Sequence, residues 1–191
     1  MTAEGMMEGE AIMSEATNRI GFGPRAGAVL IDMGLSFIGG TLIAILFGGV
    51  LGAGASSLAG PGAGSDSVDL AAIFGFIAGG TIGMTVFGVL YNLIEAFTGA
   101  SPGKRVLGLV VGSAEGTAAT QGTLMARYAV KNAQLLIALL AIVAPILAPL
   151  SPLAGLVVFG GCFAALGVGR QALHDMIVKT AVYARRDLAS A

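Results

Sequence analysis

Four long apolar runs, separated by short polar stretches, dominate the pattern of this 191-residue chain. The runs are Ala26–Gly54, Leu70–Ile94, Val130–Ala148 and Leu153–Val168. A membrane-spanning helix needs about 20 mostly apolar residues, which the first two runs exceed and the last two approach. With 11% charged residues and a mean hydropathy of +0.88, the chain requires lipid as its solvent. The pattern predicts an all-α transmembrane protein folded as a four-helix membrane bundle.

The third and fourth runs are the shortest, and Pro145, Pro149 and Pro152 lie where they join. We expect these two runs to form a tight helical hairpin that crosses the membrane and returns. A shallower re-entrant hairpin is the alternative, because both runs are near the lower length limit for a span.

Small residues recur at every fourth position of the apolar runs. In lipid this spacing lets helix backbones approach closely. We expect the stripes to serve packing within the bundle rather than a homodimer face. They are Ala44, Gly48 and Gly52; Gly75, Gly79 and Gly83; and Gly161, Ala165 and Gly169.

The long loop between the second and third runs contains a β-prone stretch at Val106–Val111. Ser113–Gly116 predicts a turn, and Thr117–Thr123 predicts a returning strand. Thr123 is then the expected cap of a helix that continues into the third run. We therefore expect a small β-prone cytoplasmic loop lying against the inner membrane surface.

Basic residues lie before the first run, between the end of the second and the start of the third, or after the fourth. Because basic loops stay on the cytoplasmic side, both termini and the long loop are predicted to be cytoplasmic. Residues 1–19 read as an acidic, disordered tail, residues 20–183 as the transmembrane domain, and residues 184–191 as a short cytoplasmic tail. The ten basic residues are Arg19, Arg25, Lys104, Arg105, Arg127, Lys131, Arg170, Lys179, Arg185 and Arg186.

The sequence lacks the familiar catalytic and binding motifs. The basic residues form no stripe with interleaved aromatic residues, which argues against nucleic-acid binding. Cys162 is the single cysteine, so no intramolecular disulfide forms, and no Cys/His spacing suggests a metal site. Gly99–Lys104 resembles a phosphate loop but has the wrong spacing, and Arg105 replaces the required Ser or Thr. We expect no enzyme activity and no cofactor.

Polar residues at the cytoplasmic ends of the four runs are predicted to converge at one depth. An unpaired aspartate in hydrocarbon costs roughly 2.5–3.5 kcal/mol, so Asp32 should face partners or water. One interpretation makes these residues anchors that fix helix register through salt bridges. The other makes Asp32 and Glu95 proton or cation carriers with pKa values raised by burial. The candidate cluster is Arg25, Asp32, Glu95, Arg127, Lys131, Asn132, His174 and Asp175.

These residues carry a resemblance to a known family. The chain has Arg25 and Asp32 seven apart, then Ser101–Pro102–Gly103–Lys104–Arg105–Val106–Leu107–Gly108–Leu109–Val110–Val111, then Arg127 with Asn132, and finally Gln171–Ala172–Leu173–His174–Asp175 followed by Thr180. This arrangement, from about Ile20 to Tyr183, resembles the RDD family of bacterial membrane proteins. The arginine and two aspartates of the family name correspond to Arg25, Asp32 and Asp175. Lys131 stands where many members have arginine, and Lys179 where a glycine usually precedes the threonine.

The resemblance implies a multi-pass protein of the bacterial inner membrane with one of two functions. The first is proton-coupled monovalent cation transport through the cluster, in which case Asp32 should be accessible to water. The second is a non-catalytic accessory or scaffolding subunit, in which case Asp32 should be fully paired. A transporter would be a homo-oligomer, because four short helices barely enclose a pathway, and an accessory subunit would hold another membrane protein through its charges and its cytoplasmic loop.

Overall fold

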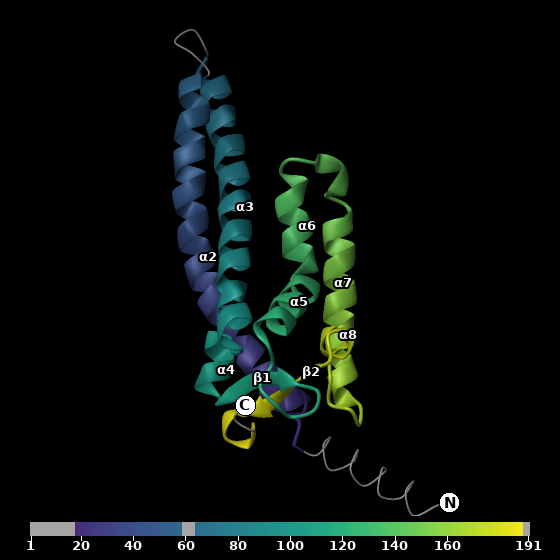
Figure 1. Ribbon diagram of the computed structural model, residues 1–191. Coiled ribbons are helices and arrows are strands. Elements are labelled where there is room, and N and C mark those ends of the chain that lie inside the picture. The colour runs from purple at the N-terminus through teal and green to yellow at the C-terminus, as the bar shows by residue number, and fades with distance from the viewer. Residues whose placement is uncertain (1–17, 59–63, 189–191) are drawn as a thin grey trace, which may run out of the picture. The chain divides into compact units, whose positions relative to one another are not determined.

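The computed structural model describes residues 18–58 and 64–188 (Figure 1). Nearly all of the predicted acidic tail, residues 1–19, lies outside this part, as do the last three residues of the predicted C-terminal tail, 184–191. The described chain is mostly helical, with one small sheet. Three helical stretches are long and apolar enough to cross a membrane, and a bent pair of helices brings the number to four if it counts as one span.

The first two apolar runs form the long helices α2 (Phe22–Leu58) and α3 (Ser65–Thr98). Both extend beyond the predicted boundaries, and Pro24 lies in the first turn of α2, where proline is tolerated. At 1.5 Å per residue, each helix exceeds the roughly 30 Å of a bilayer's hydrocarbon core. Both are therefore candidate membrane spans by length and composition, in agreement with the prediction.

The third run is not the single helix that was predicted from Val130 to Ala148. Helix α5 (Gln121–Lys131) ends at Asn132, and α6 (Ala133–Ala141) continues after a bend of 67°. The carbonyl of Tyr128 accepts from the backbone N–H of Asn132 at 2.9 Å and from the side-chain amide of Asn132 at 3.0 Å. Proline then prevents α6 from continuing, and a 3-10 turn, η1, occupies Pro145–Leu147.

The fourth run forms α7 (Leu150–Cys162) and the 3-10 turn η2 (Phe163–Leu166). Together with η1 these residues make the third stretch of spanning length, Pro145–Leu166. The bent pair of α5 and α6 fits either a broken span or a re-entrant loop. The tight crossing hairpin and its re-entrant alternative therefore both remain predictions.

The sheet corrects the predicted hairpin in the long loop. Strand β1 (Leu109–Ser113) pairs antiparallel with β2 (Thr180–Ala184), far away in the sequence. The predicted return strand over residues 117–123 contributes one isolated bridge, between Gly112 and Ala118. Val106, expected in the strand, instead ends the short helix α4 (Pro102–Val106). The cap of α5 is Thr120, whose side chain accepts from the backbone N–H of Thr123 at 3.2 Å.

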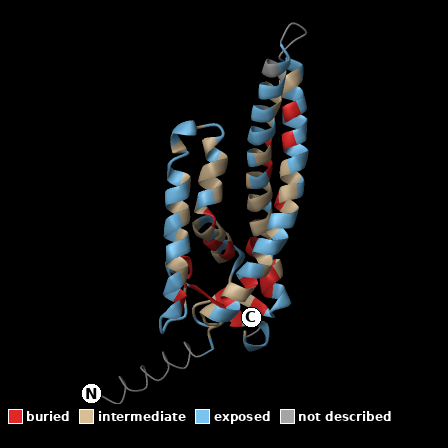
Figure 2. Cartoon of the chain, turned by 180° about the vertical axis from the view of Figure 1, so that it is seen from behind, coloured by how far each residue is buried: buried red, intermediate tan, exposed pale blue. Residues whose placement is uncertain are grey.

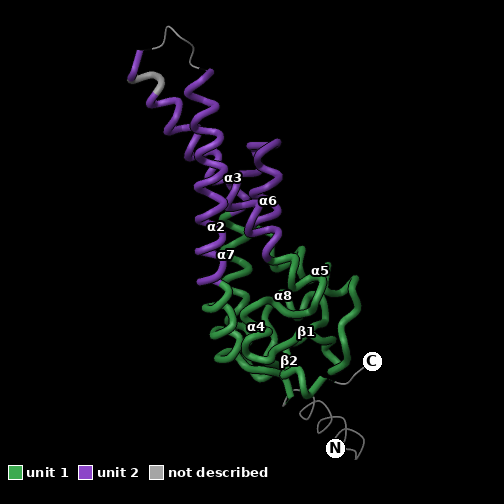
Figure 3. Tube along the Cα trace, turned by 90° about the vertical axis from the view of Figure 1, so that its left-hand side faces the viewer, with its two compact units in different colours: residues 1–32, 92–134, 152–191 green, residues 33–91, 135–151 purple. Residues whose placement is uncertain are grey.

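The chain divides into two compact units (Figure 3). Unit 1 consists of Met1–Asp32, Asn92–Gln134 and Pro152–Ala191, and contains the sheet. Its apolar core is small and surrounds the strands (Figure 2). The core residues are Ala28, Leu109, Val111, Leu124 and Val182, with Ile20 and Ala119 packed against them. The other helices of unit 1, α8 (Leu173–Ile177) and the 3-10 turn η3 (Arg185–Asp187), flank β2 in sequence.

Unit 2 consists of Met33–Tyr91 and Leu135–Ser151. Within it, the glycines of α2 and α3 face the opposite helix. A Cβ atom at Gly75 would lie 2.5 Å from the carbonyl oxygen of Leu51, and one at Gly52 would lie 2.9 Å from that of Ala72. These two small-residue stripes therefore serve packing inside the chain, as predicted, because only glycine allows the backbones this close.

Candidate functional site: a buried ion network

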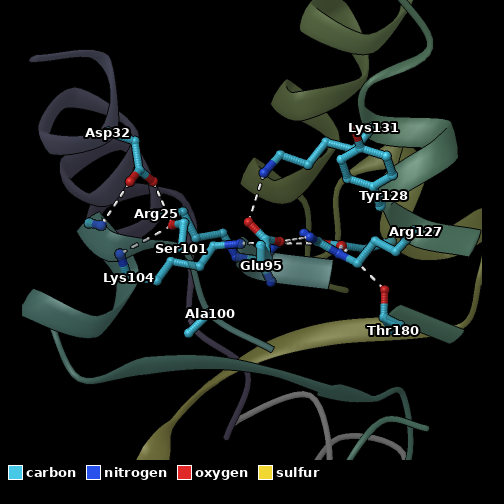
Figure 4. A network of polar contacts seen from close by, with 12 residues as sticks. Arg25, Asp32, Glu95, Ala100, Ser101, Lys104, Arg127, Tyr128, Lys131 and Thr180 are labelled. Carbon is cyan, nitrogen blue, oxygen red and sulfur yellow. Dashed lines mark hydrogen bonds and ion pairs between the residues drawn. The ribbon is translucent and has the colours of Figure 1, made fainter. Parts of the chain in front are cut away.

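Six charged residues of unit 1 form a continuous set of ion pairs, here called the buried ion network (Figure 4). Helix α2 supplies an arginine, α3 a glutamate, α4 a lysine, α5 an arginine and a lysine, and α8 an aspartate. Five elements distant in sequence therefore meet through their charged side chains. The six residues are Arg25, Glu95, Lys104, Arg127, Lys131 and Asp175.

Asp175 is fully buried and receives donors on both carboxylate oxygens. Arg25 donates at 2.6 Å and Arg127 Nε at 2.8 Å. The hydroxyl of Thr180 and the backbone N–H of Ala172 each donate at 3.3 Å. Burial alone would raise the pKa of this carboxyl group, but the charges of Arg127 and Arg25 hold it well below its usual value. Asp175 is therefore ionised at neutral pH.

Glu95 accepts from three cations. Lys104 Nζ lies 2.7 Å from Oε1, Lys131 Nζ lies 2.7 Å from Oε2, and Arg127 Nη1 also pairs with Oε1. Glu95, Lys104 and Arg127 are buried, and Lys131 is half-buried. Burial lowers the pKa of Lys104 to about 8. A carboxylate surrounded in this way has its main acceptor positions filled by the protein itself.

Arg127 joins the two carboxylates into one network, because its Nε bonds to Asp175 and its Nη1 to Glu95. Its third nitrogen, Nη2, lies 3.2 Å from His174 Nε2. Burial, followed by the charge of Arg127, lowers the pKa of His174 to about 3, so the ring is neutral at physiological pH. Nε2 then accepts from Arg127 and the proton resides on Nδ1, which is buried and has no hydrogen-bond partner among the described residues.

Asp32 is held by neutral donors next to the network. It accepts from the hydroxyl of Ser101 at 2.5 Å and from the backbone N–H of Gly103 at 2.8 Å. A Cβ atom at position 103 would collide with the carbonyl oxygen of Ala28 and with the Asp32 carboxyl group. Glycine is therefore required there, and Asp32 fastens α2 to the start of α4.

The sequence Ser101–Pro102–Gly103–Lys104 now has a physical explanation. Ser101 is the N-cap of α4 and accepts from the backbone N–H of Lys104 at 3.3 Å, while Pro102 occupies the first helical position. Gly103 allows the close approach to α2, and Lys104 reaches Glu95. This segment is a structural clamp rather than a phosphate-binding loop.

The eight predicted site residues are all found in unit 1. Five of them belong to the network, His174 contacts its member Arg127, and Asp32 contacts Ser101 and Gly103 of the clamp. Asn132 is buried, but its amide bonds to the carbonyl of Tyr128 at the end of α5. The sequence interpretation missed Lys104, Ser101 and Thr180 as site residues. Each of these three residues lies within or beside a sequence motif that carries the family resemblance, and that position could have identified it.

A cavity of about 10 Å³ lies beside Glu95 and is just large enough for one water molecule. It lies between α3 and α5, and its polar lining offers both donors and acceptors. The lining residues are Asn92, Glu95, Ala96, Leu124, Arg127, Tyr128, Lys131 and Asn132.

Cationic side chains outnumber carboxylates in the site. Four cations, on Arg25, Lys104, Arg127 and Lys131, accompany the three carboxylates of Asp32, Glu95 and Asp175. Within the described residues, no group of three or more His, Cys, Asp or Glu side chains is arranged to hold a metal ion. The opposite charges of the site are thus arranged to stabilise one another.

Comparison with known proteins gives one finding. A family model described as the RDD family matches residues 19–179, which include the clamp, Arg127 and the His174–Asp175 pair. Neither the curated proteins nor the solved structures yield a match. The match covers most of the chain and contains the whole buried ion network. With its apolar helices and this set of paired arginine and aspartate side chains, the chain belongs to the RDD family.

Proposed function

We propose that this protein is a non-catalytic accessory or scaffolding subunit of a larger membrane assembly. The observation that carries the proposal is that the carboxylates of the site already accept hydrogen bonds from the protein's own donors. Eight of these bonds have donor–acceptor distances of 2.5–3.3 Å. A cation carrier must exchange such donors for its ion at every cycle. Breaking a buried pair costs about 3–5 kcal/mol, so this network resists exchange.

The long helices support the same proposal. Neither α6 nor α7 contains a buried residue, and most large apolar residues of α2 and α3 are exposed. Helices exposed to this extent have surface available for lipid and for the helices of other subunits. The partner is another membrane protein or further copies of this chain.

The distribution of charge supports an orientation. All ten lysines and arginines fall in unit 1, and the residues of unit 2 include none of them. By the positive-inside rule, the sheet and the buried ion network belong on the cytoplasmic side of a bacterial inner membrane, with both chain termini on that side.

Proton-coupled transport of a monovalent cation is the second candidate. The observation in its favour is the cavity beside Glu95, where one water molecule could carry a proton to the carboxylate. The excess of cationic side chains around Glu95 opposes it, because a positively charged cargo would be repelled.

Reconstitution separates the two functions. Wild-type protein is placed in vesicles that contain a pH-sensitive dye, and gradients of Na⁺, K⁺ and Li⁺ are applied. A subunit without transport activity moves no protons, and Asp32→Asn lowers the thermal unfolding midpoint because one carboxylate acceptor of the clamp is lost. Asp187→Asn is the matched control, since this aspartate is exposed. Cation-driven proton movement in wild type that disappears in a stably folded Asp32→Asn variant would establish transport instead.

Cross-linking in intact membranes, followed by purification in a gentle detergent and mass spectrometry, tests the assembly itself. We expect a defined partner in fixed stoichiometry that also recovers this chain when the partner is purified. A chain that cross-links neither to itself nor to a second protein contradicts the scaffolding proposal.

A further inference from the structure

Two short helices of unit 1 are built with their polar side inward. In α8, His174 and Asp175 are buried in the ion network, while Met176 and Ile177 are 47% and 58% exposed. A helix on the surface of a water-soluble protein has the opposite arrangement, with its apolar side toward the core. Helix α8 is therefore matched to apolar surroundings.

Helix α4 repeats this inversion. Gly103 and Lys104 are buried against α2 and Glu95, whereas Val106 and the following Leu107 are 70% and 42% exposed. Both short helices contact the sheet, α4 at β1 and α8 at β2 (Figure 1). The same inversion in two separate elements beside the sheet indicates a common apolar environment.

Exposed cations adjoin both apolar faces. Arg105 directly precedes Val106, and Lys179 follows Ile177 by two residues; both basic side chains are exposed. Long basic side chains at a membrane interface extend toward the phosphate groups while their aliphatic parts remain among the acyl chains. Anionic lipids attract each such charge with about 1 kcal/mol near the surface.

We propose that α4 and α8 lie in the membrane interface and bind anionic phospholipids of the leaflet on the basic side. Val106, Leu107, Met176 and Ile177 contact the acyl chains, and Arg105 and Lys179 contact the phosphates. The buried ion network then lies at the depth of the interface rather than in open solvent. This proposal does not depend on the accessory function, because it concerns lipid contact alone.

The absence of tryptophan from the sequence makes a direct test possible. Single reporters are introduced as Val106→Trp and Ile177→Trp, with Glu115→Trp, in the exposed turn of the long loop, as the aqueous control. The purified proteins are reconstituted in vesicles that contain phosphatidylcholine and phosphatidylglycerol. We expect blue-shifted emission from positions 106 and 177, strong quenching by lipids brominated on the acyl chain, and little quenching by acrylamide. The control should show the reverse.

Headgroup preference is measured in the same system. At equal mole fraction, brominated phosphatidylglycerol should quench the tryptophan at position 106 at least twofold more than brominated phosphatidylcholine. Adding Arg105→Gln should abolish this difference while the quenching by phosphatidylcholine remains. Arg186→Gln, an exposed cation in η3, is the matched control and should leave the difference unchanged.

Two outcomes overturn the proposal. Acrylamide quenching at positions 106 and 177 equal to that at 115 would place both helices in water, as expected if their apolar faces await a protein partner. Equal quenching by the two lipids would show that these helices do not prefer an anionic headgroup. Leu107→Trp and Met176→Trp replace the first reporters if either of those variants fails to fold.

Discussion

Arg127 is the residue on which the site depends most. Its guanidinium group contacts Glu95, Asp175 and His174 through three different nitrogen atoms. Lysine carries the same charge but lacks the planar fork, so it cannot make these three contacts together. The position therefore requires arginine for its geometry as much as for its charge.

We expect Arg127→Gln to lower the free energy of unfolding by about 3–5 kcal/mol, because two buried carboxylates each lose a charged donor. Arg127→Lys should fall between this variant and wild type. Denaturant titration in lipid nanodiscs measures the loss. Arg186→Gln is the control, since the Arg186 side chain is 88% exposed. Equal stability of the Arg127→Gln and Arg186→Gln proteins would contradict the importance given to the network.

His174 makes stability depend on pH. Its pKa is lowered to about 3 in the folded protein from an ordinary value of 6.5, so the unfolded chain binds a proton first as the pH falls. The contribution of the neutral ring to stability is complete above pH 6.5 and is lost progressively toward pH 3. Below about pH 4, protonation of Asp175 in the unfolded chain adds a further loss.

We therefore expect the thermal unfolding midpoint to fall between pH 6.5 and pH 4 in wild type and to fall less steeply in His174→Gln. The glutamine carbonyl can still accept from Arg127 but does not titrate in this range. Thermal scans at half-unit pH steps make the comparison. Parallel curves for the two proteins would exclude His174 as the titrating group.

At the scale of the elements, local sequence was a good guide to helices and a poor guide to pairing. The apolar runs identified α2 and α3 because a continuous apolar stretch is itself the signal for a span. The β-propensity near Val110 and Val111 was real, but the partner strand is Thr180–Ala184 rather than the nearby threonines. Register between segments so far apart depends on the tertiary fold, which periodicity does not encode.

The same distinction applies to the site. Eight residues were predicted to converge because each lies at the end of an apolar run, and the structure brings seven of them into contact with the network or the clamp. Lys104 was missed because it lies in a loop with no membrane boundary to mark its depth. Lys179 has a positive φ of 53°, a backbone conformation that glycine adopts most easily, which agrees with the glycine that the family resemblance led us to expect there.

Close packing of α2 and α3 provides a test at this scale. A Cβ atom at Gly79 would collide with the carbonyl oxygen of Phe47, whereas one at Gly49 would meet nothing within 4 Å. We expect Gly79→Ala to lower the free energy of unfolding by about 1–3 kcal/mol, because the helices must separate. Gly49→Ala should leave it unchanged or slightly raised. The same denaturant titration applies, and a loss of equal size in both variants would show that helix separation is not the cause.

For the whole molecule, the segregation of basic residues in unit 1 leads to a topology that labelling can measure. In a Cys162→Ala background, Ser65→Cys should react with a membrane-impermeant maleimide added to intact cells, because the loop before α3 carries no basic residue. Glu115→Cys, in the exposed turn of the long loop, should react only after the cells are opened. Labelling of position 115 from outside would reverse the proposed orientation.

The order of the network's members along the chain has a consequence for biogenesis. Lys104 follows its partner Glu95 by only nine residues, so this pair is available soon after α3 has left the ribosome. Asp175, in contrast, is synthesised 150 residues after Arg25 and 48 after Arg127. Strand β1 likewise must wait for β2, which begins at Thr180, shortly after α8. During synthesis Arg25 therefore lacks its carboxylate partner until α8 is made, and Arg127 until then has only one of its two, Glu95.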